Sequence, residues 1–326
     1  MGFSDLKPTV VYDTYWRFAV KRQEIFYNRM EGKAFPWTDD TILQTYKFTN
    51  AYRASDRVSQ YLIRNVIYSK DVFSPEDICF RILFFKLFNK IETWEYIQKH
   101  LGVISLTTYD YEIYNKLLMQ KMHNNESIYS AAYIMPSGKS FFGYDKKHQN
   151  HLKLLEYMMQ TGLPKKIAKA KTLKELYEIL LGYSSLGSFL AFQFAIDINY
   201  SELCDFSEMS FVVAGPGAKN GIQKCFGDLK GFQYEDIIQY VAEHQEEEFE
   251  KRGLKFKSLF GRKLQLIDCQ NLFCETDKYA RVVHPDISGL NDRKRIKQQY
   301  TDHNFKKIEF YYPPKWGLND KINNCL

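Results

Sequence analysis

The chain has 326 residues, and 45% of them are hydrophobic, which is enough to bury a large core. Its formal net charge of +6 permits a nucleic-acid partner without requiring one, because a basic cleft matters more than the total charge. The sequence has no signal peptide and no apolar run long enough to cross a bilayer, so we expect a protein of the cytoplasm without a membrane partner.

The cysteines follow neither the paired spacing of a zinc site nor the pattern of a small disulfide-rich domain. They are Cys79, Cys204, Cys225, Cys269, Cys274 and Cys325. His148 and His151 are three positions apart but have no neighbouring carboxylates that would complete a metal site. We therefore expect reduced thiols, no metal ion and no other cofactor.

The first third of the chain is predicted to be helical. Apolar residues recur at helical spacing from residue 9 to residue 27, and the turn residues at 36–40 end that pattern. Two further helices are expected to meet near Asn50. The segment 75–101 has a broad apolar stripe, which is typical of core helices.

A different pattern follows at 131–144, where aromatic and β-branched residues flank Pro-Ser-Gly. Such a turn between strand-forming residues predicts a small β-hairpin inserted in a helical chain. Helices are then expected at 148–161, 173–181 and 187–198, the last apolar on nearly all sides and therefore the most buried.

The final third contains an acidic and a basic segment. Residues 235–252 carry a run of glutamates, which predicts a solvated helix. An apolar approach leads to Asp268 and a further helix, and residues 291–308 are strongly basic. We expect Arg293, Arg295 and Lys297 to face DNA.

Between these segments, Gly215-Pro-Gly217-Ala-Lys219 reads as a tight turn that leads into a helix. Both glycines permit positive φ and leave backbone N–H groups uncovered, and the helix dipole favours an anion there. We therefore expect Gly215, Gly217 and Lys219 to contact DNA phosphate. A plain turn with a solvated lysine is the alternative.

Three stretches together resemble the helix-hairpin-helix DNA glycosylases of the endonuclease III type. They are the helix junction at 48–62, the glycine turn at 215–219, and Leu266-Ile-Asp268 with the residues after it. The resemblance implies that Asp268 is the catalytic carboxylate and that Lys219 is the second catalytic residue. Asp268 lies further from Lys219 than in short family members, which makes Asp236 a rival acid. A helix cap is the structural alternative for Asp268.

The same resemblance implies that a base is extruded from the duplex and replaced by a protein side chain. Tyr52 or Arg53, beside Asn50 at the helix junction, could fill that space. The alternative is that Tyr52 belongs to the core and Arg53 pairs with Asp56.

A closer resemblance covers nearly the whole chain and rests on 48–62, 187–201 and 264–274. These stretches resemble the helical family linked to thymine hypermodification in phages, which includes α-glutamyl/putrescinyl thymine pyrophosphorylases and the helical domain of 5-hydroxymethyluracil DNA kinases. The chain has no Gly-x-x-x-x-Gly-Lys-Ser/Thr phosphate-binding loop, so we do not expect kinase activity from it.

These resemblances imply a mostly α, two-lobed helix-hairpin-helix glycosylase-like fold with a small β-hairpin insertion. We expect residues 1–125 and 255–326 to form one lobe, 145–250 the helix-hairpin-helix lobe, and 128–146 the hairpin insertion.

The expected partner is double-stranded DNA that carries modified, phage-type bases. The first hypothesis is hydrolytic excision of a 5-hydroxymethyl-derived pyrimidine, which would leave an abasic site and serve anti-phage defence. The alternatives are a transferase that substitutes activated 5-hydroxymethyluracil, and a non-catalytic reader of modified bases.

Overall fold

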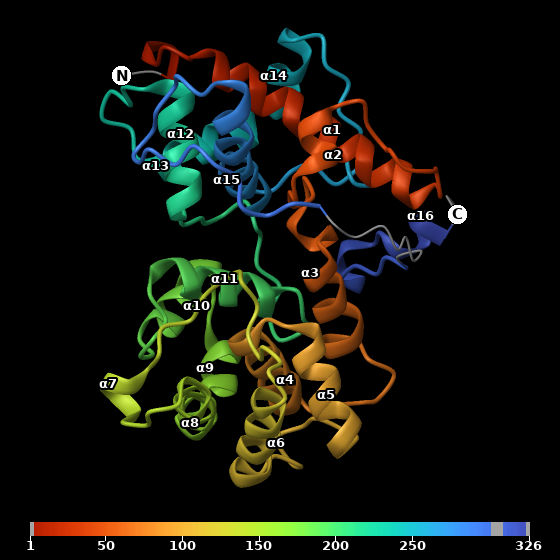
Figure 1. The fold of residues 1–326 in the computed structure, drawn as a ribbon, viewed down its shortest axis with the longest axis vertical. Coiled ribbons are helices and arrows are strands. Elements are labelled where there is room, and N and C mark those ends of the chain that lie inside the picture. The colour runs from red at the N-terminus through yellow and green to blue at the C-terminus, as the bar shows by residue number, and fades with distance from the viewer. Residues whose placement is uncertain (1–2, 301–308, 324–326) are drawn as a thin grey trace. The chain divides into compact units, whose positions relative to one another are not determined.

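The computed structural model describes residues 3–300 and 309–323 of the chain (Figure 1). These residues are mostly helical, which confirms the expected class. The described ranges contain no β-strand and two isolated antiparallel bridges, Tyr46 with Gln299 and Leu259 with Arg262. No helix within those ranges is long and apolar enough to cross a membrane.

The chain divides into two compact units. Unit 1 comprises Met1–Asp56, Phe211–Phe310 and Pro314–Leu326, and unit 2 comprises Arg57–Ser210 and Tyr311–Pro313. This division differs from the expected lobes, because the helix after the glycine turn packs on the N-terminal helix and belongs to the same unit.

Unit 1 contains the N-terminal helix and most of the elements after residue 210. Its elements are η1 (Phe3–Asp5), α1 (Val10–Met30), α2 (Thr41–Thr45), η2 (Arg53–Ser55), α12 (Pro216–Phe226), α13 (Tyr234–Glu243), α14 (Gln245–Lys251), α15 (Leu266–Val283), η4 (Pro314–Trp316) and α16 (Asn319–Asn323). Helix α15 contacts α1, α12, α13 and η2, and in Figure 1 it lies between α12 and α1. It is therefore the central element of this unit.

Helix α1 begins where the sequence predicts. The Thr9 side chain accepts the Val11 N–H at 3.1 Å, which satisfies one of the unpaired donors of the first turn. The apolar positions that follow are buried, including Trp16 and Phe18. This face packs on α12 and α15.

The secondary-structure elements of unit 2 are all helices. They are α3 (Arg57–Tyr61), the π-helix η3 (Leu62–Ile67), α4 (Pro75–Phe88), α5 (Ile91–Leu101), α6 (Tyr111–His123), α7 (Lys139–Phe142), α8 (Lys147–Gln160), α9 (Leu163–Lys169), α10 (Leu173–Leu181) and α11 (Ser188–Asn199). In α11 every residue from Leu190 to Asn199 is buried, as predicted, and the helix packs on α10 and α4.

The predicted β-hairpin at 128–146 is wrong. Gly138 adopts a left-handed conformation with φ of 69° and precedes the short helix α7. The N–H groups of Phe141 and Phe142 both donate to the Gly138 carbonyl at 3.1 Å, which closes a helical turn. The glycine therefore starts a helix, where the sequence pattern suggested a reversal between two strands.

The glutamate-rich helix is only partly solvated. Glu248 on α14 is 6% exposed, and its carboxylate accepts Arg252 Nη1 at 2.7 Å and Lys251 Nζ at 3.0 Å. Phe249 beside it is buried against Trp16. This helix closes part of the unit 1 core and is not the freely solvated element expected.

Candidate nucleic-acid interface

Asp268 occupies the first turn of α15, where its carboxylate serves the backbone. One oxygen accepts the Gln265 N–H at 3.0 Å in a capping box, and the other accepts the Arg53 N–H at 2.8 Å. The residue is 4% exposed. This is the helix-cap alternative of the sequence analysis, extended by a bond that ties η2 to α15.

Tyr52 and Arg53 belong to the interior of unit 1. Each is 2% exposed. The Tyr52 hydroxyl donates to the Arg262 carbonyl at 2.6 Å and accepts the Leu259 N–H at 3.1 Å. The burial confirms the alternative that Tyr52 belongs to the core, and neither side chain is placed to fill the space of an extruded base.

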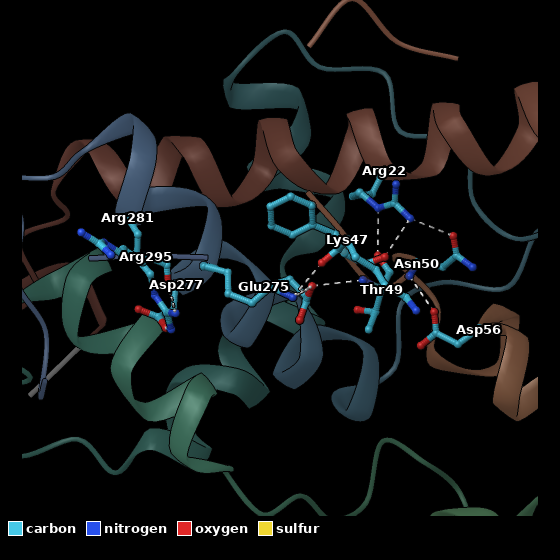
Figure 2. Close-up of polar contacts among 11 residues, drawn as sticks. Arg22, Lys47, Thr49, Asn50, Asp56, Glu275, Asp277, Arg281 and Arg295 are labelled. Carbon is cyan, nitrogen blue, oxygen red and sulfur yellow. Dashed lines mark hydrogen bonds and ion pairs between the residues drawn. The ribbon is translucent and has the colours of Figure 1, made fainter. Parts of the chain in front are cut away.

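Asn50 lies in a polar junction that also includes Arg22 and Asp56 (Figure 2). Its N–H donates to Asp56 Oδ1 at 2.7 Å, and its amide oxygen accepts Arg22 Nη2 at 3.1 Å. Arg22 Nε also donates to the Thr49 carbonyl at 2.8 Å. Burial lowers the pKa of Arg22 to about 10 and raises that of Asp56 to about 7. The junction holds the backbone at Thr49 and Asn50 through partly buried polar contacts.

The glycines of the predicted phosphate turn have another role. Gly215 is the N-cap of α12 with φ of −72°, and Gly217 lies within the helix, so the expected positive φ is wrong at both. A Cβ at Gly217 would lie 2.2 Å from Cys274 Sγ, and one at Gly221 would lie 2.0 Å from the Phe273 carbonyl oxygen. These glycines allow α12 to approach α15 closely.

Lys219 and Asp236 lie on separate helices of unit 1. The half-buried Lys219 has its ammonium 5.4 Å from the centre of the Tyr234 ring. Asp236 is exposed and accepts the Gln233 N–H at 2.8 Å in the capping box of α13. The three catalytic candidates thus lie on three different helices, with Lys219 on α12, Asp236 on α13 and Asp268 on α15.

A buried charge cluster links α12 to α15 instead. Lys224 Nζ lies 3.0 Å from Asp277 Oδ1, and the side chains of Asn220 and Arg281 also donate to the Asp277 carboxylate. Asp277 is 1% exposed and Lys224 is 3% exposed. The Asn220 amide oxygen in turn accepts the Asn291 N–H at 3.1 Å, which connects the cluster to the basic segment.

Arg293, Arg295 and Lys297 are all exposed, as expected for a surface that faces a polyanion. The carbonyl of Arg295 accepts Arg281 Nη1 at 3.2 Å, a contact drawn in Figure 2. Lys306 and Lys307, also part of the expected basic stretch, lie outside the described residues.

Polar residues of α15 and α12 that organise this region were not predicted from the sequence. Glu275 accepts the Thr49 N–H at 3.0 Å, while Asp277 and Lys224 form the cluster above. The i,i+4 spacing of Asp277 and Arg281 is a local signal of a helical ion pair that could have been used. The pairing of Lys224 with Asp277 has no such signal.

Unit 2 contains a separate buried ion pair. Lys86 Nζ on α4 lies 2.6 Å from Asp197 Oδ2 on α11, and both side chains are 2% exposed. The ammonium is also 4.1 Å from the centre of the Tyr133 ring. Asp197 lies within the 187–201 stretch quoted above for the family resemblance, but its partner Lys86 lies on α4, and nothing local in the sequence predicts a pair between two helices so far apart in the chain.

The described residues contain no group of three or more His, Cys, Asp or Glu side chains suited to a metal ion. His151 Nε2 is 2.7 Å from the Pro136 carbonyl oxygen, and its Nδ1 is 2.7 Å from the Tyr129 hydroxyl. Because a carbonyl only accepts, Nε2 carries the proton and Nδ1 accepts from Tyr129. Both ring nitrogens of this histidine are thus used by the fold.

Two comparisons place the chain among known proteins. The family model described as "5-hmdU DNA kinase, helical domain" matches residues 9–289. The chain is 27% identical over 345 residues to a 5-hmdU DNA kinase of Bacillus phage SP10, covering 97% of this chain but 51% of that protein. It thus spans about half the length of this relative, and no solved structure matches it. The match over most of its length shows that the chain belongs to the family of the 5-hmdU DNA kinase helical domain.

Proposed function

We propose that this chain modifies DNA bases, acting on DNA that contains 5-hydroxymethyluracil or an activated form of it. The observation that carries the proposal is the family match over residues 9–289, supported by the phage relative named as a 5-hmdU DNA kinase. These comparisons favour the base-modifying alternative over the excision hypothesis.

Excision also lacks support from the geometry of its proposed acid. A carboxylate that stabilises a cationic sugar must face the substrate. Asp268 is 4% exposed, and its two oxygens accept the N–H groups of Gln265 and Arg53. These contacts give Asp268 a structural role in the first turn of α15.

Phosphoryl transfer is not the step we assign to this chain. The sequence Gly138-Lys139-Ser140 matches the end of a phosphate-binding loop, but Tyr133 stands where that motif has its first glycine. Helix α7 after it has four residues, and the Lys139 side chain pairs with Asp145. We assign the kinase step to the part of the longer relative that this chain does not cover.

The remaining chemistry is substitution at the 5-methylene carbon, as its resemblance to the thymine-hypermodification family implies. The C–O bond to an activated hydroxyl group breaks, and the leaving phosphate or pyrophosphate keeps the electron pair. An amine forms the new C–N bond and releases a proton. Burial raises the pKa of Cys79, Cys225, Cys269 and Cys274, which disfavours these thiols as covalent nucleophiles at neutral pH.

The test is incubation of the purified chain with duplexes that contain thymine, 5-hydroxymethyluracil or its pyrophosphorylated form, with and without glutamate or putrescine. Mass spectrometry of the released nucleosides is expected to show an amine adduct only on the activated base. Alkali-labile strand breaks would support excision and overturn the proposal. Preferential binding to modified duplexes without any mass change would also overturn the proposal and would support the non-catalytic reader of modified bases.

A further inference from the structure

The basic segment at 291–300 is paired with a second segment from the start of the chain. Tyr46 and Gln299 form an antiparallel bridge. The Lys47 N–H donates to the Gln298 carbonyl at 3.0 Å, and the Tyr300 N–H donates to the Thr45 carbonyl at 2.8 Å. Residues 45–47 and 298–300 thus lie side by side although they are far apart in sequence.

The same segment is fixed at its other end by α12 and α15. The Asn291 N–H donates to the Asn220 amide oxygen at 3.1 Å, and Arg281 donates to the Arg295 carbonyl at 3.2 Å. A second guanidinium nitrogen of Arg281 binds Asp277, so its position is set by the buried cluster. The segment is therefore anchored near 291, at 295 and at 298–300.

The cationic side chains of this segment form no ion pair in the described part of the chain. Arg293, Lys294, Arg295 and Lys297 are exposed, as is Lys47 on the paired segment. Within the described residues no ion pair involves any of these five, and Asp292 is the one acid between positions 291 and 298. The result is a concentration of unpaired positive charge on an anchored backbone.

We propose that residues 45–47 and 291–300 form one basic arch that binds the phosphate backbone of duplex DNA, with Arg281 as the positioning residue of the arch. Phosphates are the partner whose charge complements such a surface, and contacts of this kind give affinity without sequence preference. An arch that is already anchored loses less conformational entropy on binding than a free basic tail would. The inference rests on the proposed function, which supplies DNA as the substrate.

The first experiment measures binding of an unmodified duplex to the full chain across a salt series. Each phosphate contact contributes about 0.9 to the slope of log affinity against log salt. Substituting Arg293, Arg295 and Lys297 by Gln together is expected to lower the slope by about 2–3, and Lys47→Gln by about 1. The matched control replaces the exposed Lys165, Lys169 and Lys171 by Gln, and it is expected to retain the wild-type slope.

The second experiment tests the positioning role with Arg281→Gln, which keeps every cation of the arch. The expected result is faster amide hydrogen exchange at 293–297 together with a smaller salt slope. Faster exchange with the wild-type slope would overturn the positioning role, because the cations would then bind without the anchor.

The outcomes separate this inference from the proposed function. If the arch triple variant keeps the wild-type slope, or if the control triple loses as much, the arch is wrong even when base modification proceeds. If the slope depends on the arch but no duplex gains an amine adduct, the arch stands and the proposed reaction fails.

Discussion

Asp268 accepts the backbone N–H of Arg53 at 2.8 Å across a sequence separation of 215 positions. This bond attaches the turn η2 to the first turn of α15, the helix around which unit 1 is built. Because the second carboxylate oxygen caps α15 through Gln265, one buried side chain stabilises two backbone elements.

Replacing Asp268 with Asn is expected to destabilise unit 1 without abolishing base modification by the protein that remains folded. The amide nitrogen cannot accept, so one buried N–H loses its partner at a cost of about 1–3 kcal/mol. Urea denaturation measures the free energy of unfolding. The control is Asp236→Asn, where the exposed carboxylate makes a single cap bond and the expected loss is below about 1 kcal/mol. Full stability with complete loss of reaction would restore the catalytic hypothesis for Asp268.

The close packing of α12 on α15 predicts that Gly217→Ala destabilises the protein by about 1–3 kcal/mol. The new Cβ would collide with the Cys274 thiol, so Cys274→Ala in the same chain is expected to recover part of the loss. Gly221→Ala should resist such rescue, because its Cβ meets the Phe273 carbonyl. Thermal denaturation of the single and double variants measures the coupling.

The matched control for these variants is Gly187→Ala, since a Cβ at Gly187 meets nothing within 4 Å. Equal stability of Gly217→Ala and wild type would contradict the packing role. A selective loss of DNA affinity at unchanged stability would instead favour the phosphate turn expected from the sequence.

Local patterns in the sequence were sufficient to predict the positions of several helices. The segment 173–181 coincides with α10, and the segment 187–198, apolar on nearly all sides, predicted the buried helix α11 within one residue at each end. The signal that predicted them, apolar periodicity, is short in range. The hairpin at 131–144 failed because a left-handed glycine starts a helix as readily as it turns a strand.

The site residues were harder to predict because their partners are remote. The sequence predicted a catalytic role for Asp268 and phosphate binding for Gly217, whereas the contacts of Asp268 with Arg53 and of Gly217 with Cys274 depend on the tertiary packing. For Tyr52 and Arg53 the sequence left open both contact with an extruded base and a structural role inside the fold, because polarity alone does not reveal burial when the polar atoms have partners inside. The ion pair of Lys86 with Asp197 could not be predicted either, because its two residues lie far apart in the sequence.

Two buried histidines predict acid sensitivity of unit 2. Burial lowers the pKa of His148 and of His151 to about 4 from an ordinary 6.5, and both are neutral in the fold. The unfolded chain binds protons first as pH falls, so the stability they contribute is complete above 6.5 and is lost progressively towards pH 4. The loss is on the order of 3 kcal/mol for each histidine.

Unfolding measured by urea between pH 7 and pH 4 tests this histidine effect. The variant with both His148 and His151 replaced by Gln should lose the part of the pH dependence between 6.5 and 4. The exposed His123→Gln serves as the control and should retain it. An unchanged slope in the double variant would assign the acid sensitivity to other groups.

The ion pair between Lys86 and Asp197 predicts strong non-additivity. Asp197→Leu alone should destabilise the protein by about 3–5 kcal/mol, since it leaves a buried ammonium without its carboxylate. Adding Lys86→Met removes that charge, and a buried pair replaced by apolar side chains is often neutral in stability. We expect the double variant to recover most of the loss in urea denaturation. The exposed pair Lys139–Asp145, treated in the same way, should show no measurable coupling, because water screens its charges. If the double variant is no more stable than Asp197→Leu, the prediction is wrong. The packing of α4 on α11 would then require the charged side chains themselves.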